Sequence, residues 1–267
     1  MKDKIAICVM MAVFSVPTVT HAMRWGTDFV GSQWTMDGKD FRESLNNLQV
    51  TADIYGYALT KKLTQGNLGG TASLFVEGNS RLCLGTALGY GVMPSVSVKY
   101  GITNSLGTHI DFALVNKTVY IPLDLYLKYT TRSGKFSLSG GGGADYVMAR
   151  TDFSDVFSDG AWIKASFTQK KVVPHVQAGC ELFLAKWISL SLGVKYLFSA
   201  VLDNLRGNVV INGGSKKKSI LIMHVTPPVG QFIGYRETSK PPAAGDRPLK
   251  YDLSGVRANF GLRVYFK

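Results

Sequence analysis

Apolar and polar residues alternate strictly along two adjacent runs in the second half of the chain, at 172–184 and 188–198. On the first run one face is mainly aliphatic and the other carries His175 and Glu181, while on the second run Lys195 lies on the polar face. Alternation with a period of two predicts β-strands, and the tight break between the runs predicts an antiparallel hairpin. Each run is long enough for the roughly 9–11 residues with which a tilted strand crosses a bilayer.

Similar alternation recurs along most of the chain, interrupted by turn-like residues. The further predicted strands lie at 48–59, 68–76, 81–91, 95–101, 108–115, 119–130, 135–149 and 251–266. With the hairpin they make about ten strands, and because two early ones are weak, a count of eight stays open. The pattern predicts an all-β fold, a transmembrane antiparallel β-barrel of 8–10 strands with long outer loops, its apolar side chains facing lipid and its polar side chains facing the lumen.

The connections between the later strands alternate in length. Those at 132–134 and 185–186 are short, whereas those at 150–170 and 202–250 are long. Bacterial barrels have short periplasmic turns and long outer loops. The asymmetry therefore predicts a barrel over residues 48–267 with its N-terminus in the periplasm.

The residues before this barrel fall into two parts. Residues 1–22 carry two lysines, an apolar run at 5–16 and a small-residue end, which is the layout of a cleavable secretory signal peptide. This segment predicts export, and with the strand pattern it predicts a location in the cell outer membrane. Residues 23–47 are mixed and polar, and we interpret them as an N-terminal periplasmic arm. No later run of about 18 apolar residues occurs, which argues against a helical membrane protein.

Two local patterns refine this picture. Segments 208–212 and 219–225 are apolar and flank a Gly-Gly-Ser-Lys sequence, which predicts a hairpin within the long last loop. The glycine run 140–143 follows a strand, but neither a helix start nor a GK[ST] sequence comes after it, so it is not a phosphate loop. Glycines within strands mark bends or a close approach of the backbone.

Charge and cysteine content narrow the function classes. The 267 residues have a net charge of +12, yet their lysines and arginines are scattered, which argues against nucleic-acid binding. Attraction to anionic lipid headgroups is the better interpretation of the excess, so we expect outer-membrane lipids as partners. Cys8 belongs to the predicted signal peptide, and Cys83 and Cys180 lack CxxC spacing, so we expect isolated thiols. The histidines also lack ligand spacing, and we predict neither a metal site nor a cofactor.

Three stretches, 174–179 leading into 190–196, 135–146 and 260–266, carry a resemblance to OmpW-like and related small outer-membrane β-barrels. Residues 174–179 leading into 190–196 resemble the penultimate hairpin of these proteins, and 135–146 resemble the strand before it. Residues 260–266 resemble the C-terminal strand that such proteins present to the barrel-assembly machinery, although Lys267 follows the usual terminal aromatic residue. The resemblance implies an outer-membrane barrel that uses this machinery. In the family, OmpW-like members are taken to pass small hydrophobic molecules, while others are structural.

Charged and histidine side chains on the polar faces form a predicted lumen network. Its members are Asp53, Glu77, Lys99, His109, Asp111, Asp124, Lys128, Asp145, His175, Glu181, Lys195, Arg257 and Arg263. Both signs are represented, and buried charges need partners or water because an isolated one costs several kcal/mol, on the order of ion desolvation. Two arrangements stay open: a plug of salt bridges, or a polar constriction under an entry pocket.

Aromatic residues near strand ends fit the girdles at the two membrane interfaces. They are Tyr90, Tyr100, Tyr120, Tyr129, Tyr146, Trp187 and Tyr196. A soluble β-sandwich that binds a ligand would instead place such residues and the aliphatic faces in its core, and this alternative stays open.

The strand pattern together with the resemblance implies a passive pore for small hydrophobic solutes or a structural barrel, and not an enzyme. The alternative is a barrel enzyme that modifies outer-membrane lipid with His109 or His175 as the base, although no serine is marked out as a nucleophile.

Overall fold

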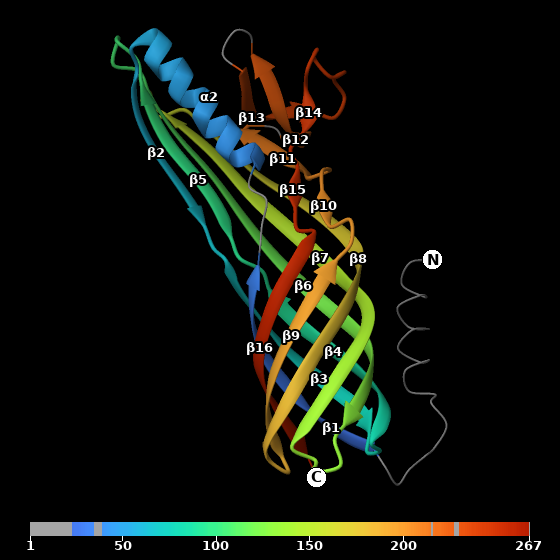
Figure 1. Cartoon of the computed structure of the whole chain (residues 1–267). Helices are drawn as coiled ribbons and strands as arrows, with labels where there is room; N and C mark the ends of the chain where they lie inside the picture. Colours follow the sequence, from blue (N-terminus) through green and yellow to red (C-terminus); the bar gives the residue numbers. More distant parts are fainter. Residues whose placement is uncertain (1–22, 35–38, 215, 227–229, 267) are drawn as a thin grey trace.

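The computed structural model describes residues 23–34, 39–214, 216–226 and 230–266 (Figure 1). The predicted signal peptide lies outside these residues. No helix in the described part of the chain is long and apolar enough to cross a membrane.

Eight antiparallel strands close into a ring, which confirms the predicted fold class and selects the lower strand count. They are β1 (Met23–Trp34), β3 (Leu68–Gly78), β4 (Leu82–Val92), β6 (His109–Thr130), β7 (Phe136–Phe157), β8 (Trp162–Ala185), β9 (Ile188–Leu197) and β16 (Gly255–Phe266). Neighbours in this order pair antiparallel, and β16 pairs with β1 to close the barrel. Short turns follow β3, β6 and β8 at the end of the barrel where both β1 begins and β16 ends (Figure 1).

The structure corrects the interpretation of residues 23–47 as an arm. Its first part is the barrel strand β1, whose Trp25 and Phe29 face outward while Asp28 is buried inside. The later part belongs to helix α2 (Lys39–Tyr55), which also replaces the strand predicted at 48–59. The buried apolar side chains of α2 follow a helical period rather than alternation. They are Phe41, Leu45, Leu48 and Ala52.

Beyond the barrel, strands β6, β7 and β8 continue, and the same sheet opens into an extension that we call the outer sheet. Here they are joined by β2 (Ala58–Gln65), β5 (Val96–Thr103), β11 (Arg206–Ile211), β12 (Lys217–Thr226) and β13 (Gly230–Glu237). The short strand β14 (Arg247–Pro248) pairs with β12, and β10 (Val201–Leu202) pairs with β15 (Tyr251–Asp252). Helix α2 lies across the hollow side of the outer sheet and contacts β13 and β2 (Figure 1).

The outer sheet accounts for three further differences from the sequence prediction. The loop predicted at 150–170 is mostly strand, with a turn only at 158–161 between β7 and β8. The loop predicted at 202–250 contains β11 to β14, and its predicted hairpin is confirmed by the pairing of β11 with β12. The break predicted between 115 and 119 is absent because β6 runs through it, with the buried Asn116 donating a hydrogen bond to Thr151 (2.8 Å).

An apolar belt surrounds the barrel, bounded at each end by exposed aromatic side chains. Trp25, Tyr129, Phe136, Trp187 and Phe266 lie toward the short-turn end, and Tyr90, Tyr146, Tyr196 and Phe198 lie toward the outer sheet. Along β7 ten residues separate the two girdles, which gives roughly 26 Å for a strand tilted by about 40°. That height matches the apolar band of a membrane barrel, about 25 Å.

Two of the predicted girdle residues point inward instead. Tyr120 is 2% exposed and packs edge to face against Trp34, with ring centroids 5.7 Å apart. Tyr100 stacks on Phe112 inside the outer sheet, with ring centroids 4.4 Å apart. Tyr120 belongs to the main apolar core and Tyr100 packs against it; this core fills the barrel mouth and the space between the outer sheet and α2.

Candidate functional site in the barrel lumen

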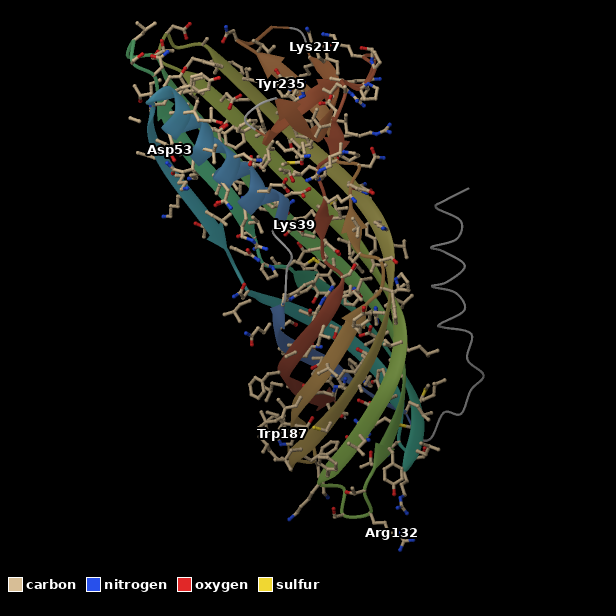
Figure 2. The ribbon with its side chains drawn as sticks, turned by 45° about the horizontal axis from the view of Figure 1, so that its top comes forward. Lys39, Asp53, Arg132, Trp187, Lys217 and Tyr235 are labelled. Carbon is tan, nitrogen blue, oxygen red and sulfur yellow. The ribbon has the colours of Figure 1, made fainter. Side chains whose placement is uncertain are left out.

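The structure brings most of the predicted lumen residues together inside the barrel. Asp124, Lys128, Asp145, His175, Glu181, Lys195, Arg257 and Arg263 lie there, with Glu77, in two clusters. Four other predicted members lie elsewhere. Asp53 is exposed on α2 and Lys99 is exposed on β5, while His109 and Asp111 lie at the far end of β6 in the outer sheet (Figures 1 and 2).

The cluster nearer the short turns, the turn-side cluster, is centred on Lys128. Its ammonium group lies 2.8 Å from Glu77 Oε1, 3.0 Å from Glu181 Oε2 and 2.6 Å from the hydroxyl of Tyr265. The side chain of Lys128 is fully buried. These three partners come from β3, β8 and β16, so a single lysine on β6 links three other strands through the barrel lumen.

Arg263 completes the turn-side cluster. Its guanidinium group lies 2.5 Å from Glu181 Oε1, 3.1 Å from Asp28 Oδ2 and 3.5 Å from Glu77 Oε2. Arg24 adds a contact of 3.4 Å to Glu77. Three carboxylates thus face three cations. This balance removes the large free-energy penalty that an unpaired buried charge would impose.

Glycines facing the lumen provide the space for these side chains. The ring of Tyr126 covers Gly85, where a Cβ would lie only 2.4 Å from it, and the Tyr126 hydroxyl donates to Glu77 Oε2 (3.0 Å). In the predicted glycine run, a Cβ at Gly143 would clash with the carbonyl of Leu123. The run therefore marks close backbone approach, one of the two roles expected from the sequence.

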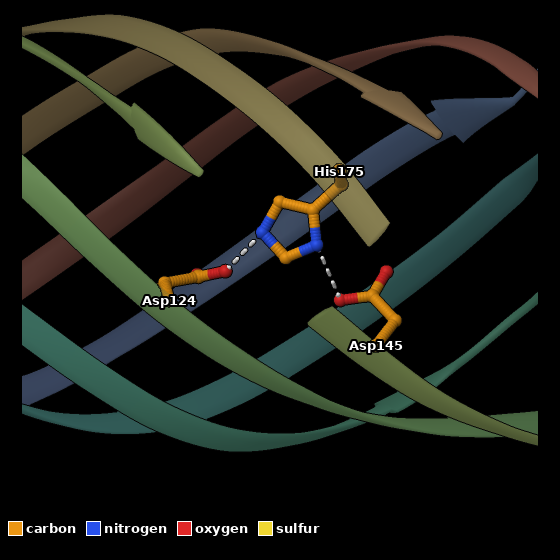
Figure 3. Close-up of side chains that lie close together, drawn as sticks. All are labelled: Asp124, Asp145 and His175. Carbon is orange, nitrogen blue, oxygen red and sulfur yellow. Dashed lines mark ion pairs between the residues drawn. The ribbon is translucent and has the colours of Figure 1, made fainter. Parts of the chain in front are cut away.

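The second cluster, the loop-side cluster, lies nearer the outer sheet and is centred on His175. Its Nε2 is 2.6 Å from Asp124 Oδ1 and its Nδ1 is 3.2 Å from Asp145 Oδ1 (Figure 3). The ammonium of Lys195 lies 3.1 Å and 3.5 Å from the same two carboxylate oxygens. Arg257 approaches the other oxygen of Asp145 at 3.4 Å. The imidazole therefore bridges two carboxylates that are also neutralised by two permanent cations.

Asp124, Asp145 and His175 also form a potential metal-ligand set, with donor atoms within 4.8 Å of one another. Two features work against a metal there. The two ring nitrogens of His175 point to different carboxylates (Figure 3). Lys195 already contacts both carboxylates, and its charge would repel a cation. The arrangement is better satisfied as an ion-pair cluster.

Apolar packing covers the loop-side cluster toward the outer sheet. The guanidinium of Arg257 lies 3.1 Å from the centre of the Trp34 ring and 4.9 Å from that of Tyr120. Cation–π contacts of this kind stabilise a desolvated cation. Beyond them, fully buried aliphatic side chains such as Leu197, Leu202 and Leu205 fill the mouth of the barrel.

Between the two clusters the lumen widens into a cavity of about 110 Å³. Its lining includes the hydroxyls of Ser32, Ser73, Ser139 and Ser191 and the ends of Lys195 and Arg263. A polar cavity of this size can hold water. The lumen thus consists of an internal polar chamber between two layers of ion pairs.

The residues that the sequence analysis missed are those of β1 and two lumen tyrosines, Tyr126 and Tyr265. Arg24 and Asp28 belong to the turn-side cluster, and Ser32 lines the cavity. Alternation of Trp25 and Phe29 with polar residues was the available signal, but the segment was interpreted as an arm.

His109, one of the two predicted candidate bases, has polar partners outside the lumen. Its Nδ1 lies 2.7 Å from the Thr103 hydroxyl and its Nε2 lies 3.1 Å from Asp111 Oδ1. All three residues lie where β5 and β6 pair, and the side chains of His109 and Asp111 are 39% and 68% exposed. A hydroxyl, an imidazole and a carboxylate therefore meet on the surface of the outer sheet.

Comparison with known proteins yields structural similarity alone. No protein-family model matches the chain, and no curated protein matches it. Among solved structures, the chain is similar to the outer membrane protein OprG from Pseudomonas aeruginosa, with 13% identity, a TM-score of 0.38 and coverage of 91% of this chain and 94% of that one. This level of similarity does not establish membership of the same family. The barrel assignment rests on the closed ring and its apolar belt.

Proposed function

We propose that this protein is a structural outer-membrane β-barrel, in which a closed barrel anchors the outer sheet and α2 at the cell surface. Of the two roles that the sequence leaves open, a pore or a structural barrel, the geometry favours the second. The observation that carries the proposal is that side chains block the lumen on both sides of its internal chamber. Two neutralised ion-pair clusters and an apolar mouth lie in series between the short turns and the outer sheet.

Each layer supports closure for a physical reason. Glu77, Lys128 and Glu181 are held by several partners at once, so opening the turn-side cluster would leave buried charges without partners. The apolar layer beyond Trp34 excludes water and ions because polar solutes lose their hydration there. A small apolar solute would have to cross both charged layers, which provide it with no favourable contact.

Single-channel conductance of the refolded mature chain in a planar bilayer tests the proposal, with the Glu181→Ala/Lys195→Ala variant beside it. We expect insertion, heat-modifiable gel mobility and no discrete conductance steps for the natural chain. The double variant removes one charge from each of the two clusters and should produce steps or raised leakage if the clusters are the barrier. Discrete steps from the natural chain that change in the variant would contradict closure and favour a pore.

One observation favours a second candidate function, a lipid-modifying enzyme that acts on the outer part of a glycolipid headgroup, because His109 lies at the far end of β6. The contacts of His109 with Thr103 and Asp111 supply a hydroxyl, a base and an orienting carboxylate, the groups that nucleophilic catalysis requires. His175, the other predicted base, is enclosed between two carboxylates in the lumen and lacks access to lipid. Mass spectra of lipid extracts incubated with the natural chain and with His109→Gln test this function. Identical spectra with and without the protein would remove it.

A further inference from the structure

The outward face of the outer sheet is strongly basic. On strands β2, β5 to β8 and β11, alternation with the buried residues places on this face Lys62, Lys99, Lys117, Arg150, Lys164, Lys170 and Arg206, all exposed, and only two acidic residues, Asp111 and Asp152. Seven positive and two negative side chains give this part of the outer sheet a charge of +5, a large part of the net charge of +12. We call it the basic face.

Cross-strand register brings like charges directly opposite one another on the basic face. Lys62 pairs with Lys99 between β2 and β5, and Lys117 pairs with Arg150 between β6 and β7. Directly opposed like charges destabilise a sheet unless an anion lies between them. Asp152 contacts Arg150 at 2.9 Å and offsets only part of this repulsion. The arrangement therefore suits an anionic partner.

The basic face continues from the surface that faces lipid. On β7, Tyr146 belongs to the aromatic girdle, and Arg150 follows it four residues later on the same side of the strand. Four residues of a tilted strand rise roughly 10 Å. This places Lys117 and Arg150, the lower tier, about level with the outer edge of a headgroup layer, which extends roughly 5–8 Å beyond the hydrocarbon.

The upper tier lies higher than a phospholipid can reach. Lys164 and the Lys62–Lys99 pair share a row with Ser154, eight residues beyond Tyr146 and thus roughly 20 Å above the girdle. A groove of about 400 Å³ opens in this row. Its lining includes Lys62, Lys99, the single acidic residue Asp111, and the small residues Gly101, Ala113 and Ser154.

We infer that the basic face binds a glycolipid whose headgroup carries phosphate or carboxylate groups on several sugars. The lower tier would hold anionic groups next to the acyl chains, and the groove with Lys62 and Lys99 would hold the outer sugars. The inference rests on the proposed function in requiring the outer sheet to lie on the outer side of an outer membrane. It adds the class of lipid that surrounds the barrel there.

The test measures binding of fluorescent lipopolysaccharide to the refolded mature chain in zwitterionic detergent. The variants are Lys62→Gln/Lys99→Gln for the upper tier and Lys117→Gln/Arg150→Gln for the lower tier. Arg132→Gln/Lys135→Gln, at the short-turn end (Figure 2), is a control that removes the same charge elsewhere. The other probes are enzymatically dephosphorylated lipopolysaccharide and vesicles of phosphatidylcholine with phosphatidylglycerol.

We expect either tier variant to weaken lipopolysaccharide binding about 10–30-fold, since each lysine or arginine near an anionic surface contributes about 1 kcal/mol, and the control to change it less than about twofold. Dephosphorylated lipopolysaccharide should bind weakly to all forms. Suppose that only the lower-tier variant weakens binding, and that the natural chain binds phosphatidylglycerol vesicles as tightly as lipopolysaccharide. The basic face would then bind ordinary phospholipid headgroups, and the inference would be overturned. If the control variant lost as much lipopolysaccharide binding as the tier variants, the binding would depend only on overall charge, and the inference would be overturned. Gel mobility before and after heating, and the absence of conductance steps in a planar bilayer, test the proposed function separately on the same samples.

Discussion

Replacing Lys128 by methionine removes the central cation of the turn-side cluster while keeping most of the side-chain volume. The ammonium group contacts Glu77, Glu181 and the Tyr265 hydroxyl at 2.6–3.0 Å, and the side chain is fully buried. Without it, the three carboxylates of the cluster face only Arg24 and Arg263. One buried negative charge is then left without compensation.

Lys128→Met should lower the free energy of unfolding by a large amount for a single substitution. Removing one partner of a buried ion pair costs about 3–5 kcal/mol, because the remaining charge keeps its desolvation penalty. Adding Glu77→Gln to Lys128→Met restores two carboxylates facing two cations. The double variant should therefore lose less than the sum of the two single variants, with a coupling free energy of about 1–3 kcal/mol.

Urea unfolding from lipid vesicles, followed by tryptophan fluorescence and by heat-modifiable mobility, measures these free energies. Lys135→Met is the matched control: it removes the same charge at the exposed short-turn end, and it should change stability by less than about 0.5 kcal/mol. A loss below about 1 kcal/mol for Lys128→Met, or strict additivity with Glu77→Gln, would refute the view that the cluster is a neutral, mutually dependent plug.

The hairpin formed by β8 and β9 shows which part of the fold can be predicted from the sequence. Lipid on one side favours apolar residues and a polar lumen on the other favours polar residues. The residue types of Leu192 and Lys195 therefore predict which side each faces. The same reasoning identified Glu181 and Arg263 as lumen residues. It could not assign them to one of the two clusters, because that depends on strand register and on how the ring closes.

The outer halves of β7 and β8 were missed because the pattern of apolar outward and polar inward residues reverses within a single strand. In the barrel part of β7 the inward residue Asp145 is charged and its outward neighbour Tyr146 is apolar. A few residues later the inward Phe153 is apolar and the outward Arg150 is charged. The change occurs where lipid outside gives way to water and where the lumen gives way to an apolar core. A segment with this reversal looks irregular when one face is assumed to be apolar throughout.

Four further substitutions test the outer sheet, the attachment of α2 and this reversal. Burial raises the pKa of Asp155, in the outer half of β7, from 3.8 to about 6. Because the folded form holds this proton more tightly, the outer sheet should lose stability as the pH rises from about 4 to above 6. Asp155→Asn should therefore stabilise the outer sheet by about 1–2 kcal/mol at pH 8, after allowance for partial exposure, and by almost nothing at pH 4. Urea unfolding measures this effect, and the same effect of the substitution at both pH values would contradict the prediction. Asp40 binds Arg247 through two hydrogen bonds of 2.8 Å, so Asp40→Asn should release α2 at a cost of about 2–3 kcal/mol, seen as faster proteolysis of the helix while heat-modifiable mobility is unchanged. Leu125 is 55% exposed between the two girdles, where lipid surrounds the barrel, and Leu125→Arg should cost about 2–4 kcal/mol in vesicles. Ser166→Arg on the outer half of β8 should change stability by less than about 0.5 kcal/mol, because its outward face meets water. Equal costs at these two positions would mean that the lipid boundary does not lie at the reversal.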